Sequence, residues 1–281
     1  MSEFDLVYAE LLSSVMLSKG YVNKRTGHQV KAEAGALFGI TANPLLQLRD
    51  IKPLWFVVET VASIAGCRDL DLFHEFGLKA WDKFADIKGN VESMYGWRWR
   101  SHFNRDQFLD LLTGLGKDNS TRHGVLITWD PANDGLYREQ VSNVPCVVAW
   151  HFHVINNGLH LTVMQRSGDL VVGVPHDIAS AWLLLELMAA HLLLDVGSLT
   201  YVISNAHIYD SHYKLVNEML DNAKHMREVG GRHSTPKVQP SMGCIESILS
   251  GNCVDVVNKL YSFILSAYEP MPTTVRPEVI L

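Results

Sequence analysis

The 281-residue sequence has few cysteines, no internal repeat and no basic run. Its four cysteines (Cys67, Cys146, Cys244 and Cys253) form no CxxC pair and no disulfide-framework spacing. This usage indicates a reducing, cytoplasmic setting, or the host cytoplasm for a viral protein. Acidic residues outnumber basic ones by 30 to 24, for a net charge of -6. This balance argues against a nucleic-acid-binding surface, because phosphate neutralisation requires clustered Lys and Arg.

The sequence also predicts neither a membrane-spanning segment nor a secretory signal peptide. The N-terminal stretch "MSEFDLVYAELL" contains acidic residues and no basic n-region, so no signal peptide is predicted. The longest apolar run, residues 178–196, is interrupted by Glu186, His191 and Asp195. A membrane-spanning helix needs about 20 nearly uncharged residues. The run therefore predicts one long buried helix in a large core, and no membrane partner.

Common cofactor signatures are absent as well. The sequence has no GxGxxG segment and no Walker loop, which gives no support to a dinucleotide or ATP site. His151 and His153 share one face of a predicted strand, but no third metal ligand stands out. No metal site is predicted.

The elements that are present indicate an α+β fold, with helices layered on a mixed β-sheet in a single domain over residues 1–281. Alternating residues on both sides of Asn157-Gly158 predict a hairpin over 146–166, turning at that pair. The Gly- and Pro-containing stretch 228–243 predicts a loop. Hydrophobic patterns predict helices over 3–18, 53–66, 69–81, 178–196 and 244–268 (with a break near Gly251-Asn252) and strands over 124–129 and 199–205.

Several polar residues in apolar surroundings are candidates for chemistry. Cys146 opens a predicted strand, and a thiol there becomes reactive only beside cationic groups, such as Arg166 at the far end of the paired strand. An isolated cysteine is more often a buried core residue. Glu59 lies within an apolar helix, as a snorkelling side chain or a buried carboxylate. Taken alone, these residues leave catalysis and packing both open.

The order of several motifs is more specific. Pro145-Cys146 is followed by "QRSGD" at 165–169, "GVPHDIA" at 173–179 and "HIY" at 207–209. This series resembles the thymidylate synthase family, whose signatures are Pro-Cys, "QRS.D", "G.PFNIA" and "H.Y". The resemblance extends upstream through "AWDKFAD" and "MYGWRWR" and covers roughly residues 20 to 212. Residues 213–270 match poorly and read as mostly helical.

The resemblance implies the catalytic roles. Cys146 is the nucleophile that adds to C6 of a pyrimidine nucleoside monophosphate, which gives C5 the character of a carbanion. Arg166 binds the phosphate and lowers the pKa of Cys146. Glu59 moves protons and organises water at the C4 substituent, and Tyr95 assists removal of the C5 proton.

The resemblance also implies the ligand contacts. Methylenetetrahydrofolate is the one-carbon donor, and the enzyme is a homodimer whose phosphate site is completed by Arg122 of the second subunit. The implied nucleotide-binding residues are Arg25, Arg122, Gln165, Arg166, Ser167, His207 and Tyr209. The implied residues of the folate pocket are Trp81, Asn143, Asp169 and Gly173, with Arg49 at the acidic folate tail.

One departure from the family pattern concerns the base. This chain has Pro175-His176-Asp177 where the family has "PFN". The family's Asn donates to O4 of uracil and accepts from the N3 hydrogen. Cytosine presents the opposite face, with an amino donor at C4 and an unprotonated N3, so a carboxyl that shares a proton suits it better. Asp177 therefore predicts a dCMP substrate, as in the deoxycytidylate hydroxymethylases of this family, with His176 either tuning the proton or capping the helix.

A second departure concerns the product. Methylating members usually have an apolar residue three positions before the nucleophile, and this chain has Asn143. A polar side chain there favours capture of water and a hydroxymethyl product. An equally good interpretation is that Asn143 simply faces solvent in a loop. The C-terminal "RPEVIL" resembles the closing tail of the methylating enzymes and favours a methyl product.

The predicted function is folate-dependent C5 hydroxymethylation of dCMP, an activity of a one-carbon transferase. The alternatives are C5 methylation of dCMP or dUMP, an inactive nucleotide-binding paralogue, and a Cys/His hydrolase built on Cys146 and His207. A DNA cytosine methylase also uses Pro-Cys, but the acidic net charge and the missing nucleotide-cofactor loop count against it. The preference for deoxyribose rests on Arg122 and Ser167.

Overall fold

The computed structural model describes residues 2–135, 143–229 and 243–280. Within them the chain forms an α+β fold around a mixed sheet, in the strand order β1-β2-β7-β5-β4-β3, with β6 beside β7. Strands β5 and β7 run parallel, and the other neighbours along that order are antiparallel. The strands are β1 (Tyr21–Val22), β2 (Gln29–Ile40), β3 (Gly124–Ile127), β4 (Val147–Ile155), β5 (Gly158–Gln165), β6 (Gly168–Asp169) and β7 (Asp195–Tyr209).

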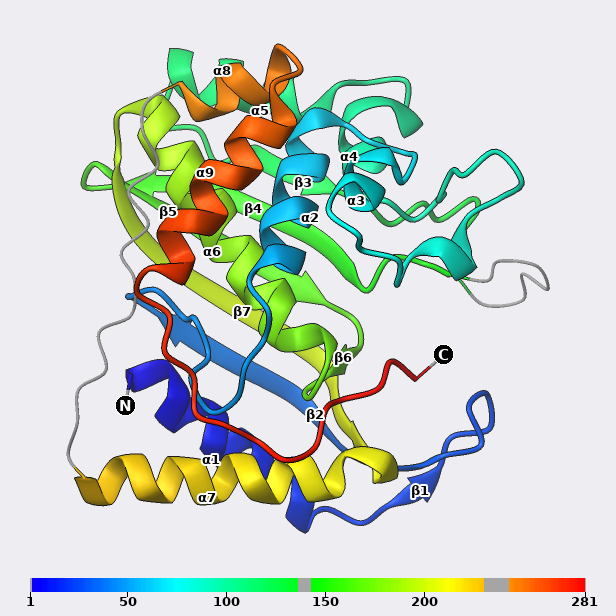
Figure 1. Cartoon of the computed structure of the whole chain (residues 1–281). Helices are drawn as coiled ribbons and strands as arrows, with labels where there is room; N and C mark the ends of the chain where they lie inside the picture. Colours follow the sequence, from blue (N-terminus) through cyan, green and yellow to red (C-terminus); the bar gives the residue numbers. More distant parts are fainter. Residues whose placement is uncertain (1, 136–142, 230–242, 281) are drawn as a thin grey trace.

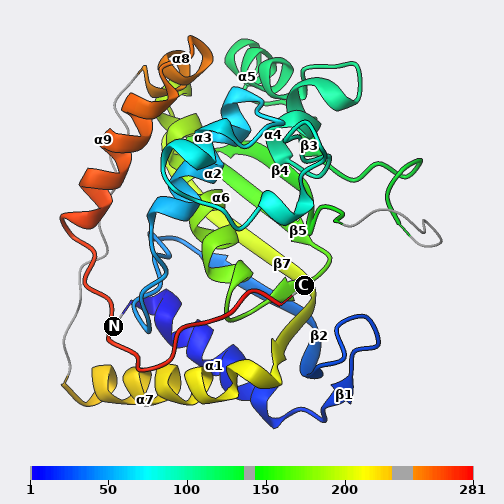
Figure 2. The ribbon, with the colours of Figure 1, turned by 45° about the vertical axis from the view of Figure 1, so that its right-hand side comes forward.

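Helices cover one face of this sheet. Figures 1 and 2 show α2, α6 and α9 layered over the strands, with α1 running along β2 and α7 beside α1. The longer helices are α1 (Glu3–Leu17), α2 (Leu54–Ala65), α5 (Gln107–Lys117), α6 (Gly173–Leu192), α7 (Tyr213–Val229) and α9 (Cys253–Leu265). The short ones are α3 (Asp71–Glu75), η1 (Asp82–Phe84), α4 (Tyr95–Trp97), η2 (Arg98–His102), η3 (Asp210–His212) and α8 (Cys244–Leu249).

The two faces of the sheet differ in burial. Leu126, Trp150, Leu161 and Tyr201 lie on the helix-covered face and are buried in the core. The opposite face carries hydrophobic side chains that stay exposed, including Met164 at 51%. Cross-strand partners share a face, so the alternation of buried and exposed residues leaves one side of the sheet uncovered.

Helix α6 is the predicted buried helix, displaced towards the N-terminus. It begins at Gly173 instead of 178 and ends where Leu193 adopts φ 57°. Residues 195–209 then form β7, which is longer than the predicted strand at both ends. No helix in the described residues is long and apolar enough to cross a membrane.

The predicted hairpin forms, but its turn lies one residue earlier than predicted. Asn156 and Asn157 both have positive φ, 48° and 65°, and Ile155 pairs with Gly158. A two-residue loop of this kind needs φ above zero at both central positions, and Asn tolerates that conformation better than other residues with a Cβ. The Asn-Asn pair therefore forms the turn, and Gly158 opens β5.

The predicted helix over 69–81 is wrong in its second half. Helix α3 ends at Glu75, because Gly77 takes φ 69° and the chain turns there. Two further elements, β2 and α5, carried no prediction. The sequence of β2, "QVKAEAGALFGI", is rich in Ala and Gly, which are poor strand formers. Long-range pairing of β2 with β7, from Val30–Tyr209 to Ile40–Leu199, holds it in the sheet.

The C-terminal part is helical where it is described. Helices α8 and α9 are separated at Gly251, which has φ 93°, close to the predicted break. Of the predicted loop over 228–243, residues 228 and 229 belong to α7, and 230–242 lie outside the described residues. After α9 the chain returns along α7 towards β6 (Figure 2).

Candidate active site

Cys146 and Arg166 meet because β4 and β5 are antiparallel neighbours. Cys146 directly precedes β4 and Arg166 directly follows β5, so the Arg166 amide donates to the Cys146 carbonyl at 2.9 Å. The Arg166 side chain turns back over the same segment. Its Nε donates to the Pro145 carbonyl at 2.9 Å and its Nη2 to the Val144 carbonyl at 3.0 Å. This arrangement leaves Nη2 3.9 Å from the Cys146 sulfur.

Opposing effects act on the thiol. Burial raises the pKa of Cys146 and outweighs the Arg166 guanidinium, which lowers it. Asp177 and Glu59 add negative charge that raises the pKa further, and Arg25 lowers it. The predicted effect of Arg166 is therefore right in direction, but the net pKa lies above the ordinary value. A thiol in this state gains reactivity when a ligand changes the charges around it.

A cavity lies next to this cysteine. Helix α2 contributes Glu59, α4 contributes Tyr95, α6 contributes Asp177, and Val147 beside Cys146 closes the sheet side. Tyr95 is fixed by the sheet, because its hydroxyl accepts from the Val147 amide at 3.4 Å. Three polar groups from three helices thus converge on one largely apolar space beside a thiol.

Both carboxyls at this cavity favour the protonated form. Burial raises the pKa of Glu59 to about 8, and the neighbouring Asp177 raises it as well. Burial likewise raises the pKa of Asp177 to about 7, against the hydrogen bond from Gln165, which lowers it. Two acids in one poorly solvated space share protons near neutral pH, which suits them to acid–base work.

Gln165 fixes the orientation of Asp177. The Ser167 carbonyl can only accept, so the Gln165 amide nitrogen is the group on that side, facing Asp177, and Oε1 faces the Tyr201 hydroxyl at 2.7 Å. That nitrogen donates to Asp177 Oδ2 at 2.8 Å and to the Ser167 carbonyl at 2.9 Å. The hydrogen bond engages Oδ2, so the two oxygens of Asp177 lie in different surroundings.

His176 does not take part in the hydrogen bonds that link Tyr201, Gln165 and Asp177. Its Nδ1 donates to the Val172 carbonyl at 2.8 Å, one turn back in α6. Burial lowers the pKa of His176 to about 4, with Arg49 adding to the effect. The ring is therefore neutral near pH 7, and it stabilises the first turn of the helix.

The residues implied at the sugar and phosphate lie along the end of β7. The rings of His207 and Tyr209 pack edge to face at 5.1 Å, and His207 Nδ1 lies 3.1 Å from Asn205 Oδ1. Arg25, in the exposed loop between β1 and β2, hydrogen-bonds Tyr209 and lies close enough to lower the pKa of Cys146. Arg25, Tyr209 and Arg166 are therefore gathered at one side of the thiol, with Ser167 next in the chain.

A second cavity adjoins the first along α2 and shares Glu59, Ser63 and Tyr95 with it. Trp81 lines it together with Glu59, Tyr95 and Ser93. Asn143 reaches this cavity through Ser93, because its amide donates to the Ser93 hydroxyl at 3.0 Å. Asn143 is thus anchored by a buried hydroxyl instead of pointing freely into solvent.

Asp169 and Gly173 flank the start of α6. Asp169 Oδ1 accepts from the amides of Val171 and Val172, at 2.8 and 3.2 Å, just ahead of the helix. A Cβ on Gly173 would come within 3.6 Å of Asp177 Oδ2, so Gly173 borders the same carboxyl as the cavity. Gly173 therefore lies next to the Asp177 carboxyl, and Asp169 stabilises the turn just before it.

Arg49 does not lie in an open pocket, where the family resemblance implied a contact with the folate tail. Its side chain is only 2% exposed, and its guanidinium donates to the carbonyls of Asp50 and Val171. It stabilises the turn before α6, which leaves it no open path to an acidic folate tail.

Arg122 is not brought to Arg166 within one chain. It lies exposed just before the edge strand β3, and its carbonyl accepts from His151 Nε2 at 3.2 Å. In the described part of the chain its side chain makes no ion pair with another residue. This position, on the uncovered side of the sheet, leaves the side chain free to reach another molecule.

Two site residues carried no sequence prediction. Tyr201 orients Gln165, and Trp129 packs its ring against the Arg166 guanidinium at 5.8 Å. Strand alternation predicts that Tyr201 faces inward, but its hydrogen-bond partner lies on a different strand. Their roles depend on contacts between distant segments, which local sequence patterns do not reveal.

A thiol and an arginine at the ends of two neighbouring strands, beside a cavity lined by two buried carboxyls from helices, define an enzyme-like site for nucleophilic catalysis. The thymidylate synthase family model matches residues 6–233, which include every one of these groups. The chain belongs to the thymidylate synthase family. Membership implies folate-dependent one-carbon transfer to C5 of a pyrimidine nucleotide, for which the family uses methylenetetrahydrofolate.

Proposed function

We propose that this protein hydroxymethylates C5 of a cytosine nucleoside monophosphate, dCMP in preference to other nucleotides. The observation that carries the proposal is the state of Asp177, a carboxyl whose pKa is raised to about 7 and which is oriented by Gln165. We further propose that residues 1–281 form one domain that carries the whole reaction.

Cytosine matches this carboxyl in hydrogen-bonding pattern. The exocyclic amino group donates to one Asp177 oxygen, while the proton on the other oxygen donates to N3. Since Gln165 donates to Oδ2, we assign the acceptor role to Oδ2 and the proton of the neutral carboxyl to Oδ1. Uracil presents an acceptor at C4 and a donor at N3, so the same arrangement leaves mismatched groups buried.

The covalent step uses Cys146. Its sulfur adds to C6, the C5=C6 electron pair moves to C5, and C5 then forms a bond with the one-carbon unit. Glu59 donates a proton near the C4 substituent, for which a carboxyl with a pKa raised to about 8 is suited. Tyr95, held by the Val147 amide, lies on the same cavity wall and assists removal of the C5 proton.

The product is decided by what reaches the exocyclic methylene left on C5 after the one-carbon donor departs. Water adds as hydroxide to the methylene and leaves one proton, while the C5=C6 bond re-forms and Cys146 is released. The Asn143 amide and the Ser93 hydroxyl form a polar pair at the second cavity, suited to hold that water. An apolar residue at 143 offers no such hydrogen bond.

The folate supplies the one-carbon unit when bound. Its proposed site is the side of the second cavity, where Trp81 offers an aromatic wall within reach of Glu59 and Tyr95. Asp169 and Gly173, at the start of α6, are proposed as further folate contacts. An aromatic wall beside carboxyls fits a flat, hydrogen-bonding pterin ring.

The proposed phosphate and sugar contacts require a second subunit. Arg166, Ser167 and Arg25 lie on the same side of Cys146, with His207 and Tyr209 as sugar ligands. Arg122 is proposed to complete the phosphate site of the partner. The uncovered sheet face supports a homodimer, because Leu37 at 65%, Ile155 at 53% and Met164 at 51% expose hydrophobic surface there.

C5 methylation of dCMP or dUMP is the second candidate, and the ordered C-terminal segment beside the site favours it. His212 holds this segment at Glu278, within the stretch that resembles the closing tail of methylating enzymes.

The Cys/His hydrolase has less support. The groups that act electrostatically on His207 are Asp169, Arg25 and His212, and Cys146 is not among them.

Mass spectrometry tests the proposal. The protein is incubated with methylenetetrahydrofolate and each of CMP, dCMP, UMP and dUMP, and every product is weighed. The proposal expects dCMP to gain a hydroxymethyl group fastest. A methyl product from dCMP overturns the product assignment alone, preference for dUMP overturns the base assignment, and four unchanged nucleotides favour the inactive paralogue.

A further inference from the structure

The Arg166 guanidinium is held by two kinds of contact. Its Nε and Nη2 donate to the carbonyls of Pro145 and Val144, at 2.9 and 3.0 Å. The indole of Trp129 also lies against it, with 5.8 Å between the guanidinium carbon and the ring centroid. A cation over the face of an indole is attracted by the ring's quadrupole within about 6 Å. Trp129 therefore contacts Arg166 without using any of its N–H donors, which stay available for a ligand.

The backbone next to Trp129 is tied to the strand that follows the thiol. Thr128 is buried, and its hydroxyl donates to the Val147 carbonyl at 2.5 Å. The Thr128 amide donates to the Val148 carbonyl at 3.0 Å. Val147 directly follows Cys146 in the chain. The position of Trp129 relative to the thiol is thus set by hydrogen bonds in which Arg166 takes no part.

A buried ion pair fixes the turn that follows Trp129. Arg98, at the start of η2, donates from two nitrogens to the two carboxylate oxygens of Asp134, at 2.9 and 3.1 Å. The two side chains are 3% and 1% exposed. Arg98 also donates to the Thr128 carbonyl at 3.2 Å, and the Asp130 amide donates to Asp134 Oδ2 at 2.9 Å. A bidentate pair of this kind is geometrically specific, so it closes residues 128–134 into one defined turn.

Gly135, the next residue after this turn, packs close to the indole. It has φ 115°, and a Cβ at this position would lie 3.3 Å from Trp129 Cζ2. A side chain here would therefore press on the ring. Trp129 thus contacts both the Arg166 guanidinium and the backbone of a turn that is anchored by a buried ion pair.

We propose that Trp129 is a positioning residue that holds the Arg166 guanidinium beside the Cys146 sulfur. Arg166 Nη2 lies 3.9 Å from that sulfur, close enough for its positive charge to stabilise a thiolate. An arginine side chain has many rotamers, and without the indole it gains conformations that carry the charge away from the sulfur. The importance of this contact for catalysis rests on the proposed function, in which Cys146 is the nucleophile.

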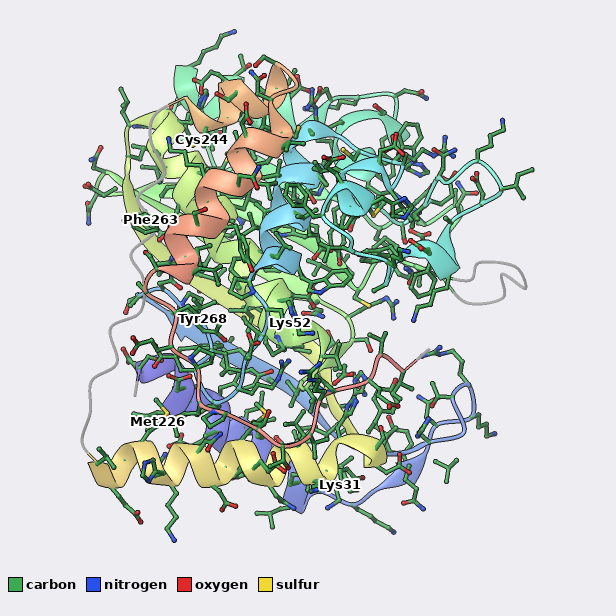
Figure 3. The ribbon with its side chains drawn as sticks, viewed as in Figure 1. Lys31, Lys52, Met226, Cys244, Phe263 and Tyr268 are labelled. Atoms are coloured by element: carbon green, nitrogen blue, oxygen red, sulfur yellow. The ribbon has the colours of Figure 1, made fainter. Side chains whose placement is uncertain are left out.

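Alkylation of Cys146 in the ligand-free protein tests the proposal without reference to activity. The rate with neutral iodoacetamide follows the thiolate fraction as the pH rises. The ratio of the rates with anionic iodoacetate and with iodoacetamide reports positive charge beside the sulfur. Peptide mass spectrometry separates Cys146 from the other cysteines. Cys244, labelled on α8 in Figure 3, is buried and serves as the internal reference, because its faster alkylation reveals general unfolding.

Trp129→Leu should raise the midpoint of the Cys146 pH–rate profile by about half a pH unit, which slows alkylation at neutral pH about threefold. The iodoacetate-to-iodoacetamide ratio should fall as well, which a simple gain in access to the thiol does not produce. Trp129→Phe keeps an aromatic face and should restore most of the wild-type behaviour. Trp129→Met replaces Trp129→Leu if the Cys244 reference shows that the leucine variant unfolds.

The matched control is Trp97→Leu. The Trp97 indole stacks on a different arginine, Arg68, at 4.5 Å, so its loss removes a similar contact and should leave both Cys146 readouts as in wild type. A second comparison asks whether the effect passes through Arg166. Arg166→Gln should itself raise the midpoint, and Trp129→Leu should cause no further change in that background.

Three results overturn the proposal. They are a wild-type midpoint and ratio in Trp129→Leu, an undiminished effect of Trp129→Leu in the Arg166→Gln background, and an equal shift in Trp97→Leu. If the protein converts no pyrimidine nucleotide, the proposed function fails, while the alkylation of the ligand-free protein still decides the role of Trp129.

Discussion

The side-chain nitrogen of Gln165 lies 2.8 Å from Asp177 Oδ2, and the Ser167 carbonyl, which can only accept, determines that this nitrogen, not the amide oxygen, faces the carboxyl. This relationship makes Asp177 an acid with distinguishable oxygens. Burial holds its pKa at about 7, so near neutral pH it exists in both forms. The proposal that the enzyme selects a cytosine base depends on this carboxyl.

Replacing Asp177 with Asn should shift preference from cytosine towards uracil nucleotides. The side chains are nearly the same size, so the fold should be retained. Each mismatched buried group costs about 1–3 kcal/mol, roughly 5- to 150-fold in kcat/KM. The measurement is kcat/KM for dCMP and dUMP in both proteins. An unchanged ratio, or a wild type that already prefers dUMP, contradicts base reading by Asp177.

Cys146→Ser should abolish turnover and leave nucleotide affinity nearly unchanged. A serine hydroxyl beside two buried carboxyls is a far weaker nucleophile than a thiol, whereas phosphate and base contacts supply the affinity. Calorimetric titration with dCMP measures binding, and Cys244→Ser, at a buried cysteine of α8, is the matched control. Substantial turnover by Cys146→Ser is the outcome that removes the nucleophile assignment.

Stability should fall as the pH rises through the range of the two carboxyls. The folded-state pKa values of Asp177 and Glu59 are raised to about 7 and about 8, so the folded state binds more protons than the unfolded state. Their contribution is present at low pH and is lost as pH rises through those values, by up to about 1.4 kcal/mol per pH unit for each group.

The comparison with Asp177→Asn isolates one of these groups. His176, whose pKa is lowered to about 4, acts in the opposite direction at lower pH, but it is present in both proteins. Urea unfolding from about pH 5 to about pH 7 should show a smaller loss in Asp177→Asn than in wild type. Asp255→Asn, at an exposed position of α9, serves as control. Parallel stability curves for wild type and Asp177→Asn contradict the raised pKa.

The product should carry a hydroxymethyl group, and the released folate should be tetrahydrofolate. Methyl transfer instead requires hydride from the folate and yields dihydrofolate, which absorbance detects. Asn143→Leu should lower the hydroxymethyl yield several-fold, because the Asn143–Ser93 pair loses its amide donor. Dihydrofolate formed by wild type at the rate of dCMP consumption would falsify the assignment of the product.

Mixing two inactive variants tests the shared phosphate site. Cys146→Ser and Arg122→Ala should each be inactive alone. If subunits exchange at random, about a quarter of all sites in a 1:1 mixture combine a wild-type Cys146 with a partner's wild-type Arg122. We therefore expect about a quarter of wild-type activity to return.

A control for this mixing experiment uses a substitution on the uncovered face of the sheet. Placing Met164→Asp in both chains should weaken the dimer and prevent the recovery of activity, because Met164 is exposed there in the single chain. Sedimentation measures the oligomeric state of each protein. Arg122→Ala that is fully active alone contradicts a phosphate contact, and a monomeric wild type contradicts the dimer.

Much of the fold and site could be predicted from sequence, because the signals are local. Alternating residues predicted the β4–β5 hairpin, and the apolar run predicted α6 as a buried helix. The Pro-Cys, "QRSGD" and "HIY" motifs predicted the family, which the match over residues 6–233 confirms. The Asp at position 177, which carries the dCMP proposal, is also visible in the sequence alone.

Tertiary structure decided the features that depend on distant neighbours. Strand β2 exists because it pairs with β7, more than 150 residues away in the chain, despite its Ala- and Gly-rich sequence. Arg49 was expected at a ligand, but the turn before α6 encloses it. The raised pKa values of Asp177 and Glu59 arise because helices α2 and α6 exclude water from both carboxyls at once. Desolvation depends on everything packed around a group, so residue order alone reveals which acid is present, and only the folded chain determines whether it carries a proton.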